Sequence, residues 1–176
     1  IVLDHVQFVN NTSQSWMHRD KIKTPAGEKW LTLSVKKAPR ETPINQIELS
    51  TTVDWVDDNL NLLRQNYRKA AYFPEIMPYV EQLYYDPPTH MADFNLRSIE
   101  MLMDLLGARI PYVLSSTLSP EGSKNELLID LLRKVGATHY LSGTGASGYM
   151  QPDLFEAAGI GLIWQDFRHP VYPQQF

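Results

Sequence analysis

The sequence predicts an α/β fold: a single three-layer domain over residues 1–176, with N-terminal strands and a hairpin, a central helical segment and a C-terminal parallel β-α-β-α-β unit. Two observations lead to this prediction. In the last third of the chain, short apolar runs alternate with helical patterns, which is typical of parallel strands joined by right-handed crossovers. Near the start, Leu31, Leu33 and Val35 occupy every second position, the period of a half-buried strand.

The first fifty residues read as strands. Residues 1–9 are rich in apolar and β-branched side chains. Residues 20–35 predict a hairpin whose turn contains Pro25 and Gly27. A third strand is predicted over residues 44–50.

The middle of the chain is predicted to be helical. The first helix spans residues 53–70, with acids in its first turn and bases in its last, as the helix dipole prefers. The second runs to about Tyr85 and is started or kinked by Pro78. Thr89 is expected to cap a third helix that ends at Gly107.

The last third predicts three strands and two helices. The strands are residues 111–116, 138–142 and 161–167. A capping box, Ser123-x-x-Glu126, opens the first helix, and Pro152 starts the second. The loops that follow the strands are residues 115–122, 142–150 and 168–173. We expect them at one sheet edge, where ligands of open α/β sheets bind.

The composition restricts the function. A formal net charge of −4 disfavours binding of nucleic acid by bulk attraction, and the absence of cysteine excludes thiol nucleophiles and zinc–thiolate sites. The sequence has no apolar run that could cross a bilayer and no signal peptide, so we expect a cytoplasmic protein. Because the chain starts without Met inside a strand-like run, we also expect a missing upstream segment.

Gly143, Gly145 and Gly148 form a G-x-G-x-x-G pattern, which can cradle a dinucleotide. Asp166 follows at the end of the next predicted strand, where a ribose-binding acid belongs. Against this, Pro152 places the following helix several residues after the glycines. Three interpretations stay open: a structural turn, a loop whose amides bind phosphate or an oxyanion, and, least favoured, a dinucleotide site.

The polar candidates each have a structural alternative. His169 can act as a base oriented by Asp166, or it can be a surface histidine. Asn95 falls on an apolar helix face, which favours a structural hydrogen-bond network over ligand contact. Arg19 and Lys21, with the neighbouring Lys23, are solvated edge-strand charges or a diphosphate site. The histidines show no spacing typical of a metal site, and Trp16 and Trp164 are expected in the core.

Taken together, six stretches resemble the WbqC-like family, in the order that the family shows. They are "LDHVQF", "HRDKIKTPAGEKWLTLSV", "INQIELS", "RQNYRKAAYF", "GATHYLSGTGASGY" and "FRHPVYPQ". The positions that match the family's pattern are Asp4, Gln7, Arg19, Gln65, Asn66, Tyr67, Asn95, Tyr140, Ser142, Gly143, Gly145, Tyr149, His169, Pro170, Tyr172 and Gln174. His5 and His18 depart from the pattern, so neither is taken as catalytic. Gly148 lies outside the family's loop pattern, which makes the dinucleotide match accidental.

The resemblance implies a role in bacterial O-antigen or other surface-polysaccharide synthesis: transfer of glycine, or another acyl group, to an amino sugar. We expect His169 as the base, with Asp166 or Asp4 orienting it. The expected substrate-binding residues are Arg19, Lys21, Gln65, Asn66, Tyr67, Asn95, Tyr140, Ser142, Gly143, Gly145, Tyr149, Tyr172 and Gln174.

The expected partners are a nucleotide-linked or lipid-linked amino sugar and an activated acyl donor, with no metal and no NAD. Acyl-CoA, aminoacyl-tRNA and an ATP-activated acid stay open as donors, and the sequence leaves the oligomeric state open. The alternatives are a non-catalytic nucleotide-sugar binding protein of the same pathway and, less favoured, an NAD(P)-dependent oxidoreductase.

Overall fold

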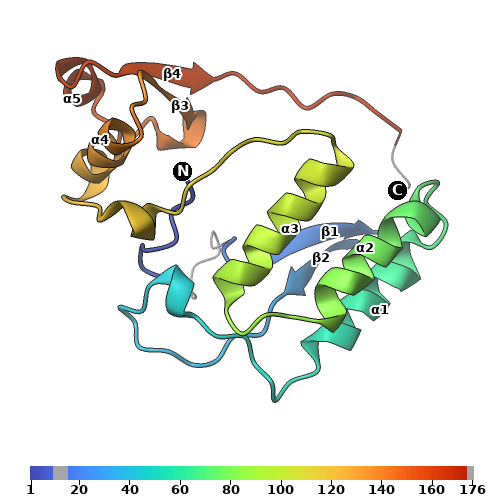
Figure 1. Ribbon diagram of the computed structural model, residues 1–176. Coiled ribbons are helices and arrows are strands. Elements are labelled where there is room, and N and C mark those ends of the chain that lie inside the picture. Colours follow the sequence, from blue (N-terminus) through green and yellow to red (C-terminus); the bar gives the residue numbers. More distant parts are fainter. Residues whose placement is uncertain (10–15, 174–176) are drawn as a thin grey trace. The chain divides into compact units, whose positions relative to one another are not determined.

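The computed structural model describes residues 1–9 and 16–173, which form two compact units. The N-terminal unit comprises residues 4–111 and Pro173, and the C-terminal unit comprises residues 1–3 and 112–172. Figure 1 shows helices together with an antiparallel strand pair in the first unit and a parallel strand pair in the second. The predicted α/β class is therefore confirmed.

The bounds of the elements follow the chain. The N-terminal unit contains β1 (Arg19–Thr24), β2 (Gly27–Thr32), the 3₁₀ helix η1 (Ile44–Gln46), α1 (Trp55–Tyr67), α2 (Phe73–Tyr85) and α3 (Met91–Leu105). The C-terminal unit contains η2 (Ser115–Leu118), α4 (Lys124–Lys134), β3 (His139–Gly143), η3 (Thr144–Ala146), α5 (Pro152–Ala157) and β4 (Gly161–Gln165).

The hairpin forms where it was predicted. β1 pairs antiparallel with β2, and the register joins Thr24 to Gly27 across a turn of two residues. The Thr24 hydroxyl donates to the Gly27 carbonyl at 2.6 Å. Gly27 has a φ of +101°, a backbone conformation that side-chain-bearing residues rarely adopt. The turn therefore requires glycine at this position.

The three central helices are also confirmed, with corrections at their starts. Asp54 caps α1 by accepting a hydrogen bond from the Asp57 amide at 3.2 Å. Pro78 lies inside α2 and does not start it, since the helix begins at Phe73. The residue that caps α3 is His90 rather than Thr89.

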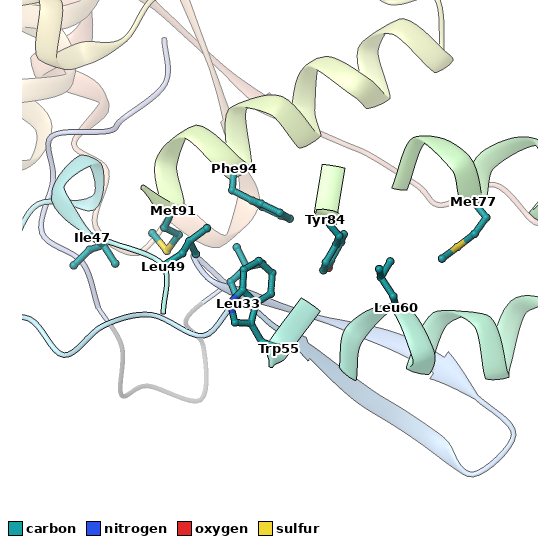
Figure 2. Packing of buried hydrophobic residues seen from close by; sticks show 9 residues of the cluster. All are labelled: Leu33, Ile47, Leu49, Trp55, Leu60, Met77, Tyr84, Met91 and Phe94. Atoms are coloured by element: carbon teal, nitrogen blue, oxygen red, sulfur yellow. The ribbon is translucent and has the colours of Figure 1, made fainter. Parts of the chain in front are cut away.

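An aromatic cluster joins these three helices. Trp55 of α1, Tyr84 of α2 and Phe94 of α3 lie with their ring centroids 5.3–5.8 Å apart, at edge-on or tilted angles. Such arrangements add to the gain from burying the rings. Figure 2 shows this cluster in the middle of the core, with Leu60 and Met77 towards one end. The three helices thus share one apolar centre.

Three predicted strands are wrong. Residues 1–9, 44–50 and 111–116 make isolated bridges instead of ladders, among them Gln7 with Pro43, Val35 with Leu49, and Val2 with Leu114. Residues 44–46 are the 3₁₀ helix η1, and η2 begins at Ser115.

The C-terminal unit is built on one parallel strand pair. β3 pairs with β4 from His139–Gly161 to Gly143–Gln165. Buried side chains of α4, α5 and the strand ends form its core, and Phe155 is fully buried there. Ser123 precedes α4, but its side chain makes no capping hydrogen bond, so the predicted capping box does not form. Over residues 1–9 and 16–173, no helix is long and apolar enough to cross a membrane.

The core assignment predicts a contrast between two leucines. Leu60 is 0% exposed, so Leu60→Ala should lower the free energy of unfolding by about 2–5 kcal/mol through lost burial and a residual cavity. Leu106 is 78% exposed, and Leu106→Ala should change the free energy of unfolding by less than about 0.5 kcal/mol. Urea unfolding followed by tryptophan fluorescence measures both. Equal losses in the two variants would contradict this core.

Candidate functional site

The predicted site residues fall into two sets, one in each unit. The N-terminal unit holds Asp4, Arg19, Lys21, Gln65, Asn66, Tyr67 and Asn95. The C-terminal unit holds Tyr140, Ser142, Gly143, Gly145, Tyr149, Asp166, His169 and Tyr172. Gln174 lies outside the described residues. Each set is described within its own unit.

In the C-terminal unit, two of the three predicted loops leave from one sheet edge. Gly143 and Gln165 are paired at the ends of β3 and β4. The glycine loop, residues 144–150, and the segment 166–172 therefore start side by side, as predicted.

The third loop, residues 115–122, runs along α4. The Ser119 carbonyl accepts a hydrogen bond from Lys134, in the last turn of α4, at 2.6 Å. Gly122, at the other end of the loop, lies close to Glu126 in the first turn of α4. Asn125, in the same turn, contacts the end of the glycine loop. Residues 111–116 form no strand that leads into this loop, and a common edge for all three loops stays a prediction.

The predicted base and its orienting acid do not contact each other in this structure. The Asp166 carboxylate faces Arg168, with 3.7 Å between Oδ2 and Nη2, and both side chains are exposed. The His169 ring lies edge-on to Phe167, with 4.9 Å between ring centroids. Pairing of Asp166 with His169 therefore requires movement of this exposed segment, and the catalytic role of His169 stays a prediction.

The glycine loop does not need its glycines for folding. Gly143, Gly145 and Gly148 have no left-handed backbone conformation, and a Cβ atom built on each meets no atom within 4 Å. The helix α5 starts at Pro152, after the loop, as predicted. Tyr149 is 68% exposed at the end of the loop. The loop thus presents accessible backbone, the property that a ligand-binding loop uses.

Three other residues of the C-terminal unit have structural partners. The Tyr140 ring stacks on Phe155, with 5.7 Å between centroids, so Tyr140 belongs to the core. Ser142 is buried. Asn125, which sequence reasoning missed, donates to the Tyr149 carbonyl at 3.1 Å and accepts from the Gln151 amide at 3.3 Å. Asn125 therefore fixes the end of the glycine loop to α4.

In the N-terminal unit, Asp4 is buried and held by Asn45. Asn45 donates through its side-chain amide to the Asp4 carboxylate at 3.2 Å and through its backbone amide to the Asp4 carbonyl at 2.9 Å. The Asn45 Oδ1 atom is buried without a hydrogen-bond partner among the described residues. Asp4 is thus part of the interior of this unit.

Tyr67 and Asn95, two of the predicted binding residues, make hydrogen bonds to the backbone of β1 and of the residues before it. The Tyr67 hydroxyl donates to the Lys23 carbonyl at 2.9 Å and accepts from the Lys23 amide at 3.1 Å. Asn95 donates to the Met17 carbonyl at 2.9 Å, which confirms the structural network predicted for this amide. Both residues therefore position the residues that precede and form β1.

Asn66 and Gln65 differ from each other in their surroundings. The Asn66 side chain donates to the Leu62 carbonyl, one turn earlier in α1, at 2.8 Å. Gln65 is exposed on the same helix.

Cations and indole rings gather on one face of the hairpin. The register pairs Arg19 with Thr32 and Lys21 with Trp30. Arg19 lies 4.4 Å and Lys21 5.2 Å from the centroid of the Trp30 ring, within cation–π range. Trp16 contacts the same ring, at 5.4 Å between centroids. We name Trp16, Arg19, Lys21 and Trp30 the hairpin surface.

This surface corrects one prediction. Trp16 is 55% exposed, so it does not belong in the core, and Trp164 of β4, expected in the core as well, is also exposed. The sequence indicated the two cations, because Arg19 and Lys21 are two residues apart in a strand. No local pattern indicated that Trp16 would contact Trp30.

His18, between Trp16 and Arg19, is a buried neutral histidine that sequence reasoning set aside. Its ring lies edge-on to Phe8, with 5.5 Å between centroids. Its Nδ1 atom is buried and has no hydrogen-bond partner in the described part of the chain. Burial, and secondarily the charge of Arg19, lower the pKa of His18 below its ordinary value.

The candidate residues form no metal centre. Among residues 1–9 and 16–173, no group of three or more histidine, aspartate or glutamate side chains could hold a metal ion. A cavity of about 540 Å³ lies between α2 and α3, lined in part by Tyr79, Arg97 and Glu100. None of the predicted site residues lines it.

His18 predicts a pH dependence of stability. In the unfolded chain the His18 imidazole takes up a proton near pH 6.5, whereas in the folded protein the buried imidazole does so only at lower pH. The free energy of unfolding should therefore fall as the pH drops below about 6.5. His18→Phe should flatten this slope. Urea titrations between pH 5 and pH 8 measure the slopes. An unchanged slope in His18→Phe would refute the assignment.

The comparisons with known proteins give a family and a curated relative. A curated relative, "Uncharacterized protein Rv1507c" from Mycobacterium tuberculosis (strain ATCC 25618 / H37Rv), is 28% identical over 168 residues, which are 95% of this chain and 71% of the relative. No solved structure matches the chain. The profile of the WbqC-like protein family matches residues 1–176, and the chain therefore belongs to this family.

Proposed function

We propose that this protein is an amide-forming transferase that moves a glycine-like acyl or aminoacyl group to the amino group of an amino sugar. We place the reaction in the cytoplasm, in the synthesis of surface polysaccharide such as O-antigen. The observation that carries the proposal is the match to the WbqC-like protein family over the whole chain. The phosphate-compatible charges of the hairpin surface support a nucleotide-linked or lipid-linked sugar as the acceptor.

The chemistry requires a base. The amino sugar arrives as an ammonium ion, and its nitrogen can attack only after losing a proton. The nitrogen then forms a bond to the acyl carbon of an activated donor. The bond from that carbon to the leaving group breaks, and the leaving group departs with the electron pair. The nitrogen gives up a second proton, to the leaving group or to solvent, as the amide forms. Because the chain has no cysteine, attack on the donor is direct and no thioester forms on the protein.

The C-terminal unit supplies candidates for these roles. His169, beyond the end of β4, is the proposed base. Gly143 and Gly145 lie at the end of β3 and just after it, where backbone amides can face the developing oxyanion. Asp166 reaches His169 only if its contact with Arg168 opens.

The second candidate is a non-catalytic nucleotide-sugar binding protein. The contact between Asp166 and Arg168 favours it, because Asp166 then does not orient His169. Incubating the full-length protein with amino-sugar nucleotides and with acyl-CoA, aminoacyl-tRNA or ATP and glycine, followed by mass spectrometry, separates the two. Acylated sugar supports the transferase. Sugar-nucleotide binding without product for any donor supports the binding protein.

The transferase makes a specific prediction for His169. His169→Ala should lower kcat by roughly 10²–10⁴-fold, the usual loss when a general base is removed. The KM for the sugar should change far less, because proton transfer matters in the transition state. His169→Gln keeps a hydrogen-bonding group without the basic nitrogen and should be nearly as slow. Normal turnover in both variants, with unchanged circular dichroism, would exclude His169 as the base.

A further inference from the structure

The hairpin surface combines two chemical properties on a single face. Residues 19, 21 and 23 alternate along β1, so the side chains of Arg19, Lys21 and Lys23 project from the same face. Opposite them on β2 lie Thr32, Trp30 and Glu28. The face therefore carries three cations and one carboxylate, although the chain as a whole has a net charge of −4. This local excess of positive charge favours an anionic ligand.

The carboxylate on this face lies to one side of the indoles. Glu28 pairs with Lys21 at 2.5 Å and stands opposite Lys23 in the register. Arg19 is at the other end of β1, opposite Thr32. The two cations nearest to Trp30 are Arg19 and Lys21, whose Cα atoms are roughly 7 Å apart along the strand. Two long cationic side chains at this spacing can reach neighbouring phosphates of one ligand.

The aromatic part of the surface is open on one side. Arg19 and Lys21 lie over Trp30, and Trp16 packs against the same ring at an interplanar angle of 53°. Trp16 is itself 55% exposed. Exposed indole beside cations is the combination by which proteins hold the planar base and the phosphates of nucleotides.

We propose that the hairpin surface binds a nucleoside diphosphate, with its base stacked on Trp16 and its diphosphate held by Arg19 and Lys21. The inference deepens the proposed function and rests on it for the sugar that the diphosphate carries. It assigns the nucleotide half of the donor or acceptor to the N-terminal unit. It also assigns a binding role to Trp16 and Trp30, which the family resemblance did not indicate.

Calorimetry at low salt with the full-length protein tests this assignment. The probes are UDP, ADP, uridine and inorganic pyrophosphate. UDP and ADP should bind about tenfold more tightly than pyrophosphate or uridine, because they alone offer both a base and two phosphates. Equal affinities for UDP and pyrophosphate, or no UDP binding at millimolar concentration, would overturn the proposal. Tighter binding of a single-stranded RNA oligonucleotide than of UDP would show instead that the surface serves RNA.

Variants locate the site. Trp16→Ala should weaken UDP binding by about tenfold, the typical loss of a stacked base, and leave pyrophosphate binding unchanged. Trp16→Phe retains an aromatic face and should recover most of the affinity. Arg19→Gln combined with Lys21→Gln should weaken both ligands. Trp164→Ala, an exposed indole in the other unit, is the matched control and should change neither. Full UDP affinity in Trp16→Ala would contradict the stacking role.

The two proposals can fail separately. UDP binding that depends on Trp16, without acylated sugar in the mass-spectrometric assay, would support the binding site and refute the transferase. Acylated sugar formed from a nucleotide-linked acceptor, with the same KM in wild type and Trp16→Ala, would support the transferase and refute the binding site.

Discussion

In the N-terminal unit, two pairs of hydrogen bonds between α1 side chains and the hairpin backbone hold the hairpin against α1. Asn59 donates to the Thr32 carbonyl at 3.0 Å and accepts from the Thr32 amide at 3.4 Å. Tyr67 makes the corresponding pair of contacts with Lys23. Asn59 and Tyr67 are eight residues apart in the helix, a rise of roughly 12 Å. Thr32 is paired with Arg19, which is four residues before Lys23 on β1, a length of roughly 13 Å. The helix and the hairpin therefore match in length between the two contacts.

These hydrogen bonds connect the hairpin to the aromatic core. Asn59, which holds Thr32, is also hydrogen-bonded to Tyr84, and burial raises the pKa of Tyr84 to about 12. Tyr84 packs in turn on Trp55 and Phe94, so the three helices and both strands share one connected set of contacts. A site built on supported strands is held more precisely than one on a free loop. Arg19, Lys21 and Trp30 of the hairpin surface lie on such strands, whereas His169 lies in an exposed segment that follows the last strand.

The sequence was informative where structure is local and uninformative where it depends on distant residues. Helical periodicity predicted α1, α2 and α3, and Gly107 lies just past the end of α3 with the positive φ expected there. The strands predicted over residues 1–9, 44–50 and 111–116 failed, because a ladder needs a partner strand that a single apolar run does not reveal. Leu49 is buried as its pattern required, yet it makes a single bridge to Val35.

In the candidate site too, the sequence indicated local features but not contacts between residues distant in the chain. The cluster of Arg19, Lys21 and Lys23 was visible in the sequence, and the apolar stripe of α3 predicted the hydrogen-bonded Asn95. Trp16 contacts Trp30 and His18 contacts Phe8, and no local spacing encodes these contacts between residues that are distant in sequence. Tyr67 matched the family pattern and was expected to bind substrate, but its hydroxyl is engaged by Lys23.

The central claim is that α1 holds the hairpin surface in place, and hydrogen exchange of Tyr67→Phe tests it most directly. This change removes the hydroxyl and keeps the ring, so the Lys23 backbone loses both contacts while the packing of α1 is preserved. The account predicts faster exchange of amides in residues 21–24 and unchanged exchange in the middle of α1. Identical exchange of the hairpin in wild type and Tyr67→Phe would contradict it.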